Sequence, residues 1–399
     1  MPTVSSRGLA LPPSPIRKLA PYADAARARG VKVYHLNIGQ PDLETPKIMR
    51  DRLRDVEPVI AYSPSNGTPQ YLAALCGYYA TVGLKVEPKH LIATTGGSEA
   101  VFFAFLCLAE AGDEVIVAEP FYTNYNSFAA MTGVKLVPVQ CKGEEGFHLP
   151  SREAFEAVVT PRTRFVLLCN PNNPTGTVYS RDEIQRVADF CRDHDLFFVS
   201  DEVYREFVYD GHKATSALDL AGMDDRVVVV DSLSKRFSAC GIRLGCLVSK
   251  NADVIASVLR AAQGRLSPPG LAQVLALGMS EIGEDYYASV RTEYQKRRDV
   301  IFEELMKIPD VFLRKPEGAF YVVARLPVTD SDDFARFLLE EFSFEGATVM
   351  VAPAAGFYAT PGLGSNEVRM AYVLNADDLR KAIQALGEGL KAYAKRRAS

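Results

Sequence analysis

The chain has 399 residues, of which 48% are hydrophobic and 24% charged, and its formal net charge is −4 at pH 7. This length permits a large buried core in one or two domains, and the slightly acidic balance excludes an overall positive field for binding nucleic acid or an anionic membrane. The seven cysteines are odd in number and scattered without a C-x-x-C pair, so we expect a protein of the reducing cytoplasm with neither a disulfide framework nor a metal site.

The N-terminal region shows no pattern of a targeting or membrane segment. Prolines at 12, 13 and 15 fall where the apolar region of a signal peptide would have to run, so we expect no secretory signal. The longest apolar stretch, AVFFAFLCLA at 100–109, is about half the ~20 residues that a bilayer span requires. It is predicted to be a buried helix, and no membrane partner is expected.

The middle of the chain alternates short apolar runs with longer amphipathic stretches. We predict strands at 91–94, 114–119, 135–140, 164–169, 196–200, 226–231 and 246–249, and helices at 98–110, 181–193 and 251–263. Nearly continuous apolar strands are typical of strands buried on both faces. Alternation of strands with helices indicates an α/β fold with a mostly parallel sheet.

The last third of the chain has a different rhythm. A long charged helical pattern at 281–310 could bridge two domains, and short strand patterns at 318–326, 347–353 and 368–373 then alternate with helices at 331–342 and from 376 onward. This pattern predicts a smaller α+β domain. We place a large domain at 46–290, and a small domain at 1–45 and 291–399 that includes an N-terminal arm.

Polar and small residues follow five of the predicted strands directly. In open α/β sheets, ligands bind beyond the carboxyl ends of the strands. The residues in question, taken in chain order, are Gly96-Gly97-Ser98-Glu99, Tyr122, Asn173 within NPNNPTG, Asp201 with Tyr204, and Ser232 with Ser234 and Lys235. If the strands are parallel neighbours, these groups share one crevice.

Simpler explanations exist for several of these residues. Ser98 could be a plain helix N-cap, and Asp201 could cap the turn that follows it; alternatively, free N–H groups beside the glycines form an anion site. GGSEA weakly resembles the G-x-S-x-G nucleophile elbow. The last position of that motif is Ala100, however, and no histidine stands at a suitable strand end, so we do not expect a serine hydrolase.

The segment SLSKRFSACGIRLG at 232–245 contains the most informative lysine. Lys235 and Arg236 could be a solvated pair, which is the usual state of such residues. The surrounding small and apolar residues make a poor place for exposed charge, and desolvation would turn Lys235 into a usable amine nucleophile. Arg243 and the two serines suit a phosphate group. A reactive lysine, an acid, an aromatic ring and a phosphate cradle together match the needs of pyridoxal 5′-phosphate.

Six motifs occur together along nearly the whole chain, namely LNIGQPDLETP (36–46), NPNNPTG (170–176), SDEVY (200–204), SLSKRFSACGIRLG (232–245), PEGAFY (316–321) and VRMAY (368–372). With them the chain resembles the class I pyridoxal-phosphate-dependent aminotransferases of fold type I, in particular the bacterial aspartate aminotransferase group. The resemblance implies a large domain whose mostly parallel mixed sheet is sandwiched by helices, and a smaller α+β domain. It also implies ping-pong transfer of an amino group from an L-amino acid, aspartate first, to a 2-oxo acid such as 2-oxoglutarate.

The same resemblance implies roles for individual residues. Lys235 would form a Schiff base with the cofactor and then move a proton, and Asp201 would pair with the pyridinium nitrogen. The residues expected around the rest of the cofactor are Asn173 and Tyr204 at the phenolic oxygen, Tyr122 on the ring face, and Gly97, Ser98, Glu99 (through its backbone), Ser232, Ser234 and Arg243 at the phosphate. Arg369, Asn173 and the backbone N–H of Gly39 would bind the substrate. Tyr62 would reach the phosphate of a neighbouring subunit, which implies a homodimer with shared sites.

Three departures from the family pattern bear on which substrate the protein uses. Tyr122 stands where relatives usually carry tryptophan, and the chain contains no tryptophan. Ile242 replaces an aromatic residue that is common before the phosphate-binding arginine, and no counterpart is assignable for the arginine that recognises a dicarboxylate side chain. Aromatic, alanine-type and branched-chain donors therefore stay open, as do a pyridoxal-phosphate-dependent lyase and a non-catalytic cofactor-binding module.

Overall fold

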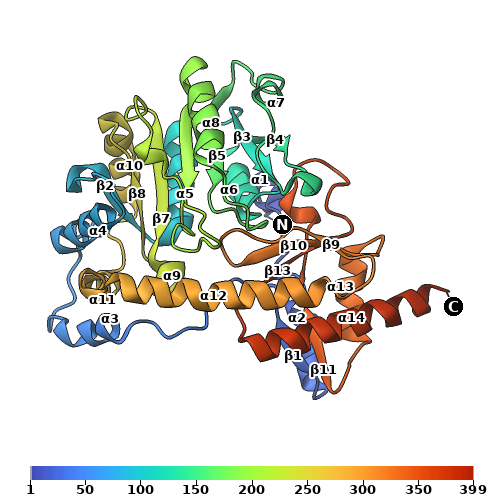
Figure 1. Ribbon diagram of the computed structural model, residues 1–399. Coiled ribbons are helices and arrows are strands. Elements are labelled where there is room, and N and C mark those ends of the chain that lie inside the picture. Colours follow the sequence, from blue (N-terminus) through green and yellow to red (C-terminus); the bar gives the residue numbers. More distant parts are fainter. Residues whose placement is uncertain (1, 399) are drawn as a thin grey trace.

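The computed structural model describes residues 2–398 (Figure 1). Its largest sheet has seven strands in the order β2-β8-β7-β6-β5-β3-β4. The strands are β2 (Leu91–Thr94), β3 (Glu114–Glu119), β4 (Lys135–Gln140), β5 (Thr163–Cys169), β6 (Phe197–Asp201), β7 (Val227–Ser232) and β8 (Gly245–Val248). Only β8 runs antiparallel to its neighbours, and the other pairs are parallel. The predicted α/β fold with a mostly parallel mixed sheet is confirmed.

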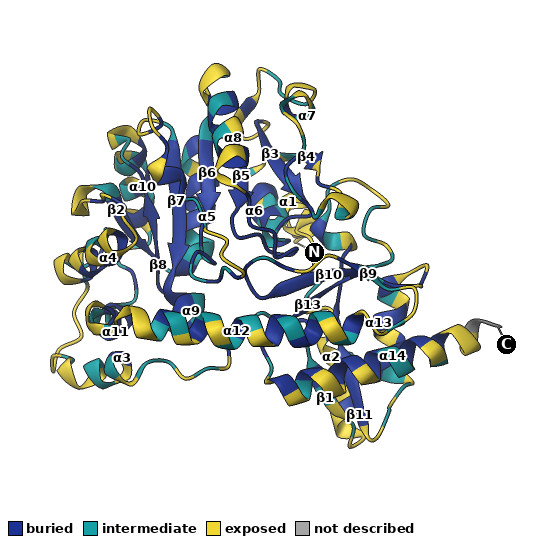
Figure 2. Ribbon diagram, in the orientation of Figure 1, coloured by how far each residue is buried: buried dark blue, intermediate teal, exposed yellow. Residues whose placement is uncertain are grey.

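Helices cover both faces of this sheet because successive strand residues point to opposite sides. Val227 and Val229 of β7 belong to a core shared with α4 (Pro69–Thr81) and α8 (Arg181–Asp193). Val228 and Val230 belong to a second core, shared with α5 (Gly96–Leu108), α6 (Asn124–Thr132) and α10 (Ala252–Gly264). All strands of this sheet except the edge strand β4 are accordingly buried at most of their positions, whereas β4 is largely half-buried or exposed (Figure 2). The apolar stretch 100–109 falls almost entirely within α5, a largely buried helix as predicted.

A second α+β unit is built from both ends of the chain. An antiparallel sheet has the order β12-β13-β10-β9, and β1 pairs with β11 in parallel. The strands are β1 (Lys32–His35), β9 (Phe312–Leu313), β10 (Tyr321–Arg325), β11 (Ala347–Met350), β12 (Ala352–Pro353) and β13 (Glu367–Ala371). Residues from these strands share a core with α2 (Ala20–Ala28), α13 (Ser331–Glu340) and α14 (Ala376–Ala398). The domain limits at 45/46 and 290/291 stay predictions.

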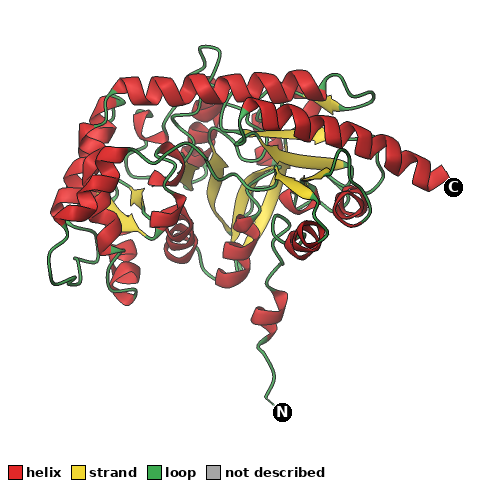
Figure 3. Cartoon of the chain, turned by 90° about the horizontal axis from the view of Figure 1, so that it is seen from below, coloured by secondary structure: helices red, strands yellow, loops and turns green. Residues whose placement is uncertain are grey.

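The long helix α12 (Glu284–Leu305) runs past α9 (Leu233–Arg236), below the large sheet, to the second unit (Figure 1). The N-terminal segment with α1 (Ser6–Ala10) extends away from the body of the molecule (Figure 3). Within residues 2–398, no helix is both long and apolar enough to cross a bilayer.

The topology brings five strand ends to one edge of the large sheet. β2 and β7 are both antiparallel to β8, so β2 points in the same direction as β7, β6, β5 and β3. The chain therefore leaves all five strands at the same edge, where ligands bind in open α/β sheets.

A buried ion cluster lies at the end of β7, directly before the lysine segment. Arg236 Nη2 contacts Asp231 Oδ2 at 2.6 Å, and Arg205 Nη1 donates to the same oxygen at 3.2 Å. Burial alone raises the pKa of Asp231, but the Arg236 and Arg205 guanidinium groups outweigh it, so this pKa lies below its usual value. The carboxylate thus holds two buried cations in place.

Replacing Asp231 with alanine is expected to lower the free energy of unfolding by about 3–5 kcal/mol, because Arg236 loses its buried counter-ion, although Arg205 keeps Glu202 at 2.6 Å. Urea unfolding followed by circular dichroism measures this loss. The exposed Asp225, which lies 3.7 Å from Arg226, is the matched control, and Asp225→Ala should change the stability by well under about 1 kcal/mol. Equal midpoints for the two variants would contradict the structural role of the cluster.

Candidate active site

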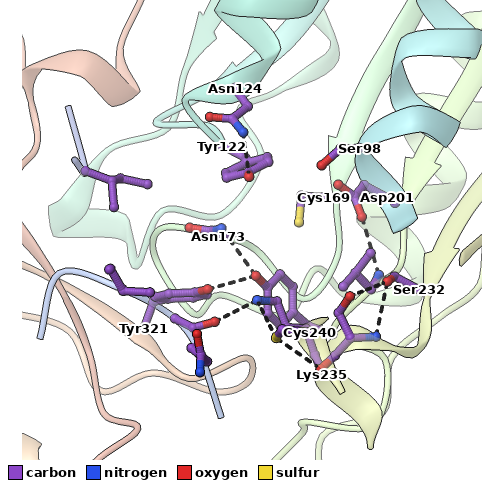
Figure 4. A pocket seen from close by; sticks show the side chains of 18 of the residues that line it. Ser98, Tyr122, Asn124, Cys169, Asn173, Asp201, Ser232, Lys235, Cys240 and Tyr321 are labelled. Atoms are coloured by element: carbon purple, nitrogen blue, oxygen red, sulfur yellow. Dashed lines mark hydrogen bonds between the residues drawn. The ribbon is translucent and has the colours of Figure 1, made fainter. Parts of the chain in front are cut away.

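A cavity of about 550 Å³ opens at the carboxyl edge of the large sheet, within the size range of small-molecule sites. The lining brings together most of the residues predicted from the sequence, namely Gly39, Gly97, Ser98, Tyr122, Asn173, Asp201, Tyr204, Ser232, Ser234, Lys235, Arg243 and Arg369. Figure 4 shows side chains from distant parts of the chain pointing into this space. Glu99 and Tyr62 do not line it.

Lys235 projects into the cavity from the short helix α9. Its Nζ donates to the Gly39 carbonyl at 2.6 Å and lies 3.8 Å from Cys240 Sγ. Burial lowers the pKa of the Lys235 amine, and the cations of Arg369 and Arg243 lower it further, whereas Cys240 opposes the shift. A lowered pKa increases the share of neutral amine, which is the form that attacks an aldehyde.

Asp201 is a buried carboxylate at the end of β6, 6% exposed. Tyr125 Oη donates to its Oδ2 at 2.8 Å. Burial raises the pKa of Asp201 to about 6, although the Tyr125 hydrogen bond favours the charged form. No described cation forms an ion pair with Asp201, so the carboxylate offers its charge to a cationic ligand group in the cavity.

Tyr125 was not predicted from the sequence. It lies three positions after Tyr122 in the first turn of α6 and is 1% exposed. Its ring meets Tyr122 edge-on, with centroids 5.6 Å apart. The available signal was the nearness of the two tyrosines in the sequence, Tyr122 just before α6 and Tyr125 in its first turn.

The start of α5 and the guanidinium of Arg243 form a cradle for an anion. A β-carbon on Gly96 would lie 2.7 Å from Arg243 Nη2, and one on Gly97 would lie 3.5 Å from Ser232 Cβ. The close contact and the positive φ of 73° require glycine at position 96 and leave the guanidinium close to the free N–H groups of the helix start, whereas the contact at position 97 is an ordinary one. Ser232 Oγ donates to Ser234 Oγ at 2.9 Å beside them. N–H groups, hydroxyls and a guanidinium are the donors that suit phosphate.

The expectation that this segment disfavours exposed charge is correct for only part of it. Arg236 is 2% exposed and Lys235 is half-buried, but Arg243 is exposed. Arg243 lines the cavity, whereas Arg236 turns inward and binds Asp231.

Amide and phenol groups form the opposite wall. Asn173 Nδ2 donates to Tyr204 Oη at 3.4 Å, and the hydroxyls of Tyr204 and Tyr321 are 2.9 Å apart. Asn124 Nδ2 donates to the hydroxyl of the half-buried Tyr122 at 2.9 Å. The sequence motif PEGAFY includes Tyr321, but no role was predicted for this residue.

Arg369 on β13 brings a buried guanidinium to the cavity at 1% exposure. Its Nη1 donates to Asn173 Oδ1 at 3.2 Å, and its Nη2 donates to the carbonyl of Asn37. Its Nε has no hydrogen-bond partner among the described residues. A guanidinium with an unused donor in a cavity suits a carboxylate ligand.

Comparison with known proteins gives the family. The sequence profile of the family described as "Aminotransferase class I and II" matches residues 31–386. The chain belongs to this family. A relative from Aquifex aeolicus, named a probable aspartate/prephenate aminotransferase, is 30% identical over 97% of this chain and 98% of its own length.

Solved structures of aminotransferases share the fold. A Thermus thermophilus aspartate aminotransferase variant superposes with a TM-score of 0.87 at 29% identity, covering 98% of this chain and 100% of the variant. An alanine aminotransferase from Pyrococcus furiosus gives a TM-score of 0.89 at 26% identity, with the same coverage. The protein is therefore an aminotransferase with the fold of type I, and the similarity extends to relatives with different donor names.

Aminotransferases of this family use pyridoxal 5′-phosphate, and the cavity of this aminotransferase has the donors that the cofactor requires. Lys235 supplies an amine of lowered pKa, and the unpaired Asp201 supplies a negative charge. The glycine cradle with Arg243 supplies donors for a phosphate. The donor set thus fits each end of the cofactor.

Two predicted residues have other surroundings in this aminotransferase. Glu99 Oε2 accepts from Thr95 N at 2.8 Å, and Oε1 lies 3.3 Å from Arg265 Nε. The Glu99 side chain is therefore occupied at the start of α5, and only its backbone is left for the predicted role at the phosphate. Tyr62 is 83% exposed and outside the cavity. A tyrosine that contacts a neighbouring subunit is expected to be exposed in a single chain. The role of Tyr62 at the phosphate of a neighbouring subunit stays a prediction.

The structure also shows why position 39 is occupied by glycine, which the sequence alone did not show. A β-carbon at this position would lie 1.8 Å from Tyr321 Oη. Any larger residue would therefore displace the Tyr321 hydroxyl from Tyr204. The carbonyl of Gly39 accepts from Lys235, whereas its predicted role toward the substrate uses its N–H.

Proposed function

We propose that this aminotransferase binds pyridoxal 5′-phosphate through Lys235 and transfers the amino group of an L-amino acid to a 2-oxo acid by a ping-pong route. Aspartate is the leading donor and 2-oxoglutarate the leading acceptor. The observation that carries the proposal is the placement of the Lys235 amine, the unpaired Asp201 carboxylate and the Arg369 guanidinium in one cavity. The names of the relatives, most of them aspartate aminotransferases, support the choice of donor.

The residues that would hold the cofactor are Asp201 at the ring nitrogen, Asn173 and Tyr204 at the phenolic oxygen, Tyr122 at the ring face, and Gly97, Ser98, Glu99 through its backbone, Ser232, Ser234 and Arg243 at the phosphate. Pyridoxal 5′-phosphate, when bound, supplies an aldehyde and a protonated ring that draws electrons from the bonds at the substrate α-carbon. The buried charge of Asp201 keeps the ring nitrogen protonated.

The chain's own residues then position the substrate and move its proton. Arg369 binds the α-carboxylate, with the Gly39 N–H and Asn173 beside it, so the α-hydrogen is held within reach of the Lys235 amine. The neutral amine of Lys235 accepts this proton from the α-carbon, and the lowered pKa of Lys235 favours the neutral form. The same amine would then deliver the proton to the C4′ carbon of the cofactor.

We also propose a cytoplasmic homodimer with shared sites. Val59, Ile60 and Tyr62 are 76%, 66% and 83% exposed, an apolar cluster of the kind that a second subunit covers. Tyr62 would then reach the phosphate of the partner's cofactor. We keep the division into a large domain at 46–290 and a small domain at 1–45 and 291–399, which the two separate sheets support although Tyr204 and Phe207 of the large domain join the core of the second unit.

The reaction is tested with the cofactor-loaded protein and a panel of amino acids, followed through the visible absorption of the cofactor. Without an oxo acid, each donor should give one half-turnover, and 2-oxoglutarate should restore the starting spectrum. Continuous release of pyruvate or ammonia would instead identify a lyase. An unchanged spectrum with every amino acid would identify a non-catalytic binding module.

Replacing Tyr125 with phenylalanine is expected to weaken cofactor binding at low pH. Loss of the Tyr125 hydrogen bond raises the pKa of Asp201, so the carboxylate is already protonated at a higher pH than in the wild type. Once protonated, Asp201 no longer attracts the ring cation. The pH below which cofactor affinity falls should therefore rise by about one pH unit. Titration of the cofactor into the apoprotein across pH measures this change.

The control is Tyr22→Phe, which removes a hydroxyl from the distant helix α2. This variant should keep the pH profile of the wild type. If Tyr125→Phe also keeps that profile, Tyr125 does not set the charge state of Asp201.

A further inference from the structure

One cation that lines the cavity has no assigned role. Among the described lining residues, Arg17, Lys235, Arg243 and Arg369 carry positive charge, and Asp201 is the one carboxylate. The proposed function engages three of these cations with the cofactor, its phosphate and the substrate α-carboxylate. Arg17 is the cation left over.

The side chain of Arg17 is not committed elsewhere. It has no hydrogen bond or ion pair with any described side chain, whereas the adjacent Lys18 pairs with Asp332 at 2.5 Å. Arg17 is exposed at the cavity mouth. Burial raises the pKa of Tyr122, and Arg17 is among the cations that oppose this rise, so its charge acts at the ring expected to stack on the cofactor.

The turn that carries Arg17 is fixed in position. The N–H groups of Arg17 and Lys18 both donate to the Ser14 carbonyl, at 3.1 and 3.0 Å. Pro15 packs so closely on Gly356 that a β-carbon there would lie 2.7 Å from Pro15 Cγ. Ile16 packs against the small apolar cluster that includes Phe357. The backbone of Arg17 is thus anchored although its side chain is exposed.

The same turn is tied to the substrate-binding arginine through one residue. Asn37 Nδ2 donates to the Ile16 carbonyl at 2.9 Å, and the Asn37 carbonyl accepts from Arg369 Nη2. Asn37 is 1% exposed. The backbone beside Arg17 and the guanidinium of Arg369 therefore share one buried anchor, which suits a ligand that carries two anionic groups.

We propose that Arg17 binds the side-chain carboxylate of a dicarboxylic substrate while Arg369 binds its α-carboxylate. This inference rests on the proposed aminotransferase function and deepens it, because it names the residue of this chain that would select an acidic donor and a dicarboxylic acceptor over substrates with one carboxylate. Asp201, which is expected to bind the cofactor, is the one carboxylate among the described lining residues, so no other lining acid competes for the Arg17 guanidinium. A guanidinium binds a carboxylate with two parallel donors.

Binding of two simple acids to the cofactor-loaded protein separates the contributions of the two arginines. Succinate carries two carboxylates and butyrate carries one on a chain of the same length. In Arg17→Met, the Kd of succinate should rise about 10- to 100-fold, and that of butyrate should change by less than about 3-fold. Isothermal calorimetry measures both values without turnover. Lys18→Met, which removes the adjacent cation, is the matched control and should change neither.

Turnover gives a second measurement on the same variants. The kcat/KM of the half-reaction with aspartate should fall about 10- to 100-fold in Arg17→Met, while that with alanine stays within about 3-fold. Arg17→Lys, which keeps the charge and loses the paired donors, should give an intermediate value with aspartate.

The inference is overturned if Arg17→Met weakens succinate and butyrate equally, or weakens neither. It is also overturned if the wild type binds butyrate as tightly as succinate. Failure of the proposed function is a separate result, because the wild-type protein would then give no half-turnover with any amino acid.

Discussion

Replacing Lys235 with arginine is expected to reduce kcat for amino-group transfer by at least about 10⁴-fold. Arginine keeps the positive charge in the half-buried site, but its guanidinium stays protonated and cannot attack an aldehyde or accept a proton from the substrate α-carbon. Steady-state assays with aspartate and 2-oxoglutarate measure the loss. Cofactor should still bind to the variant, because the phosphate cradle and Asp201 are intact.

Lys85→Arg is the control for this prediction, since Lys85 is an exposed lysine outside the cavity. It should retain full activity. A Lys235→Arg protein that still completes repeated turnovers at a rate near that of the wild type would show that another amine performs the chemistry.

The second large effect is expected for Asp201→Asn, with kcat/KM falling about 10²- to 10³-fold. Asparagine has nearly the same shape and can still accept the Tyr125 hydrogen bond, but it lacks the negative charge that keeps a ring nitrogen protonated. Half-reaction kinetics with aspartate measure the change. The effect should appear in the chemical step more than in the binding of butyrate, which is expected to depend on Arg369.

The surface residue Asp253, in the first turn of α10, provides a matched control. Asp253→Asn removes a carboxylate of the same type at an exposed helix start and should leave kcat/KM within about 2-fold. Equal activities of Asp201→Asn and the wild type would mean that the buried charge of Asp201 plays no part in the reaction.

Much of the site could be predicted because its residues follow strands whose pattern is local. Asn173, Asp201 and Ser232 each lie at or just beyond the carboxyl end of an apolar strand, and the direction rule for α/β sheets brings such ends together. The lysine segment was recognisable for a related reason, since charged residues in a small, apolar stretch after a strand need a buried partner or a function. Arg236 has the first and Lys235 is proposed to have the second.

The remaining contacts join positions that no local pattern connects. Tyr321 fills the space beside Gly39, more than 280 residues earlier in the chain, and Asn37 links Ile16 to Arg369 across two separate segments. Such contacts depend on how the N-terminal turn docks on the second α+β unit. The antiparallel direction of β8 likewise came from tertiary pairing, because its apolar sequence is compatible with either direction.

Arg17 illustrates the same limit at a functional position. In the sequence it is one of two adjacent cations, and nothing there separates it from Lys18. The structure does so, because Lys18 pairs with Asp332 while Arg17 lines the cavity. Specificity residues of this kind become visible only when the charges of a cavity are compared with those of the expected ligands.

Lys235 is proposed to hold the cofactor covalently. The most direct test is to reduce the cofactor-loaded protein with borohydride, digest it, and locate the added cofactor mass by peptide mass spectrometry. We expect one modified residue, Lys235, in the peptide that spans the end of β7 and α9. Modification of a different lysine, with Lys235 unmodified, would contradict it.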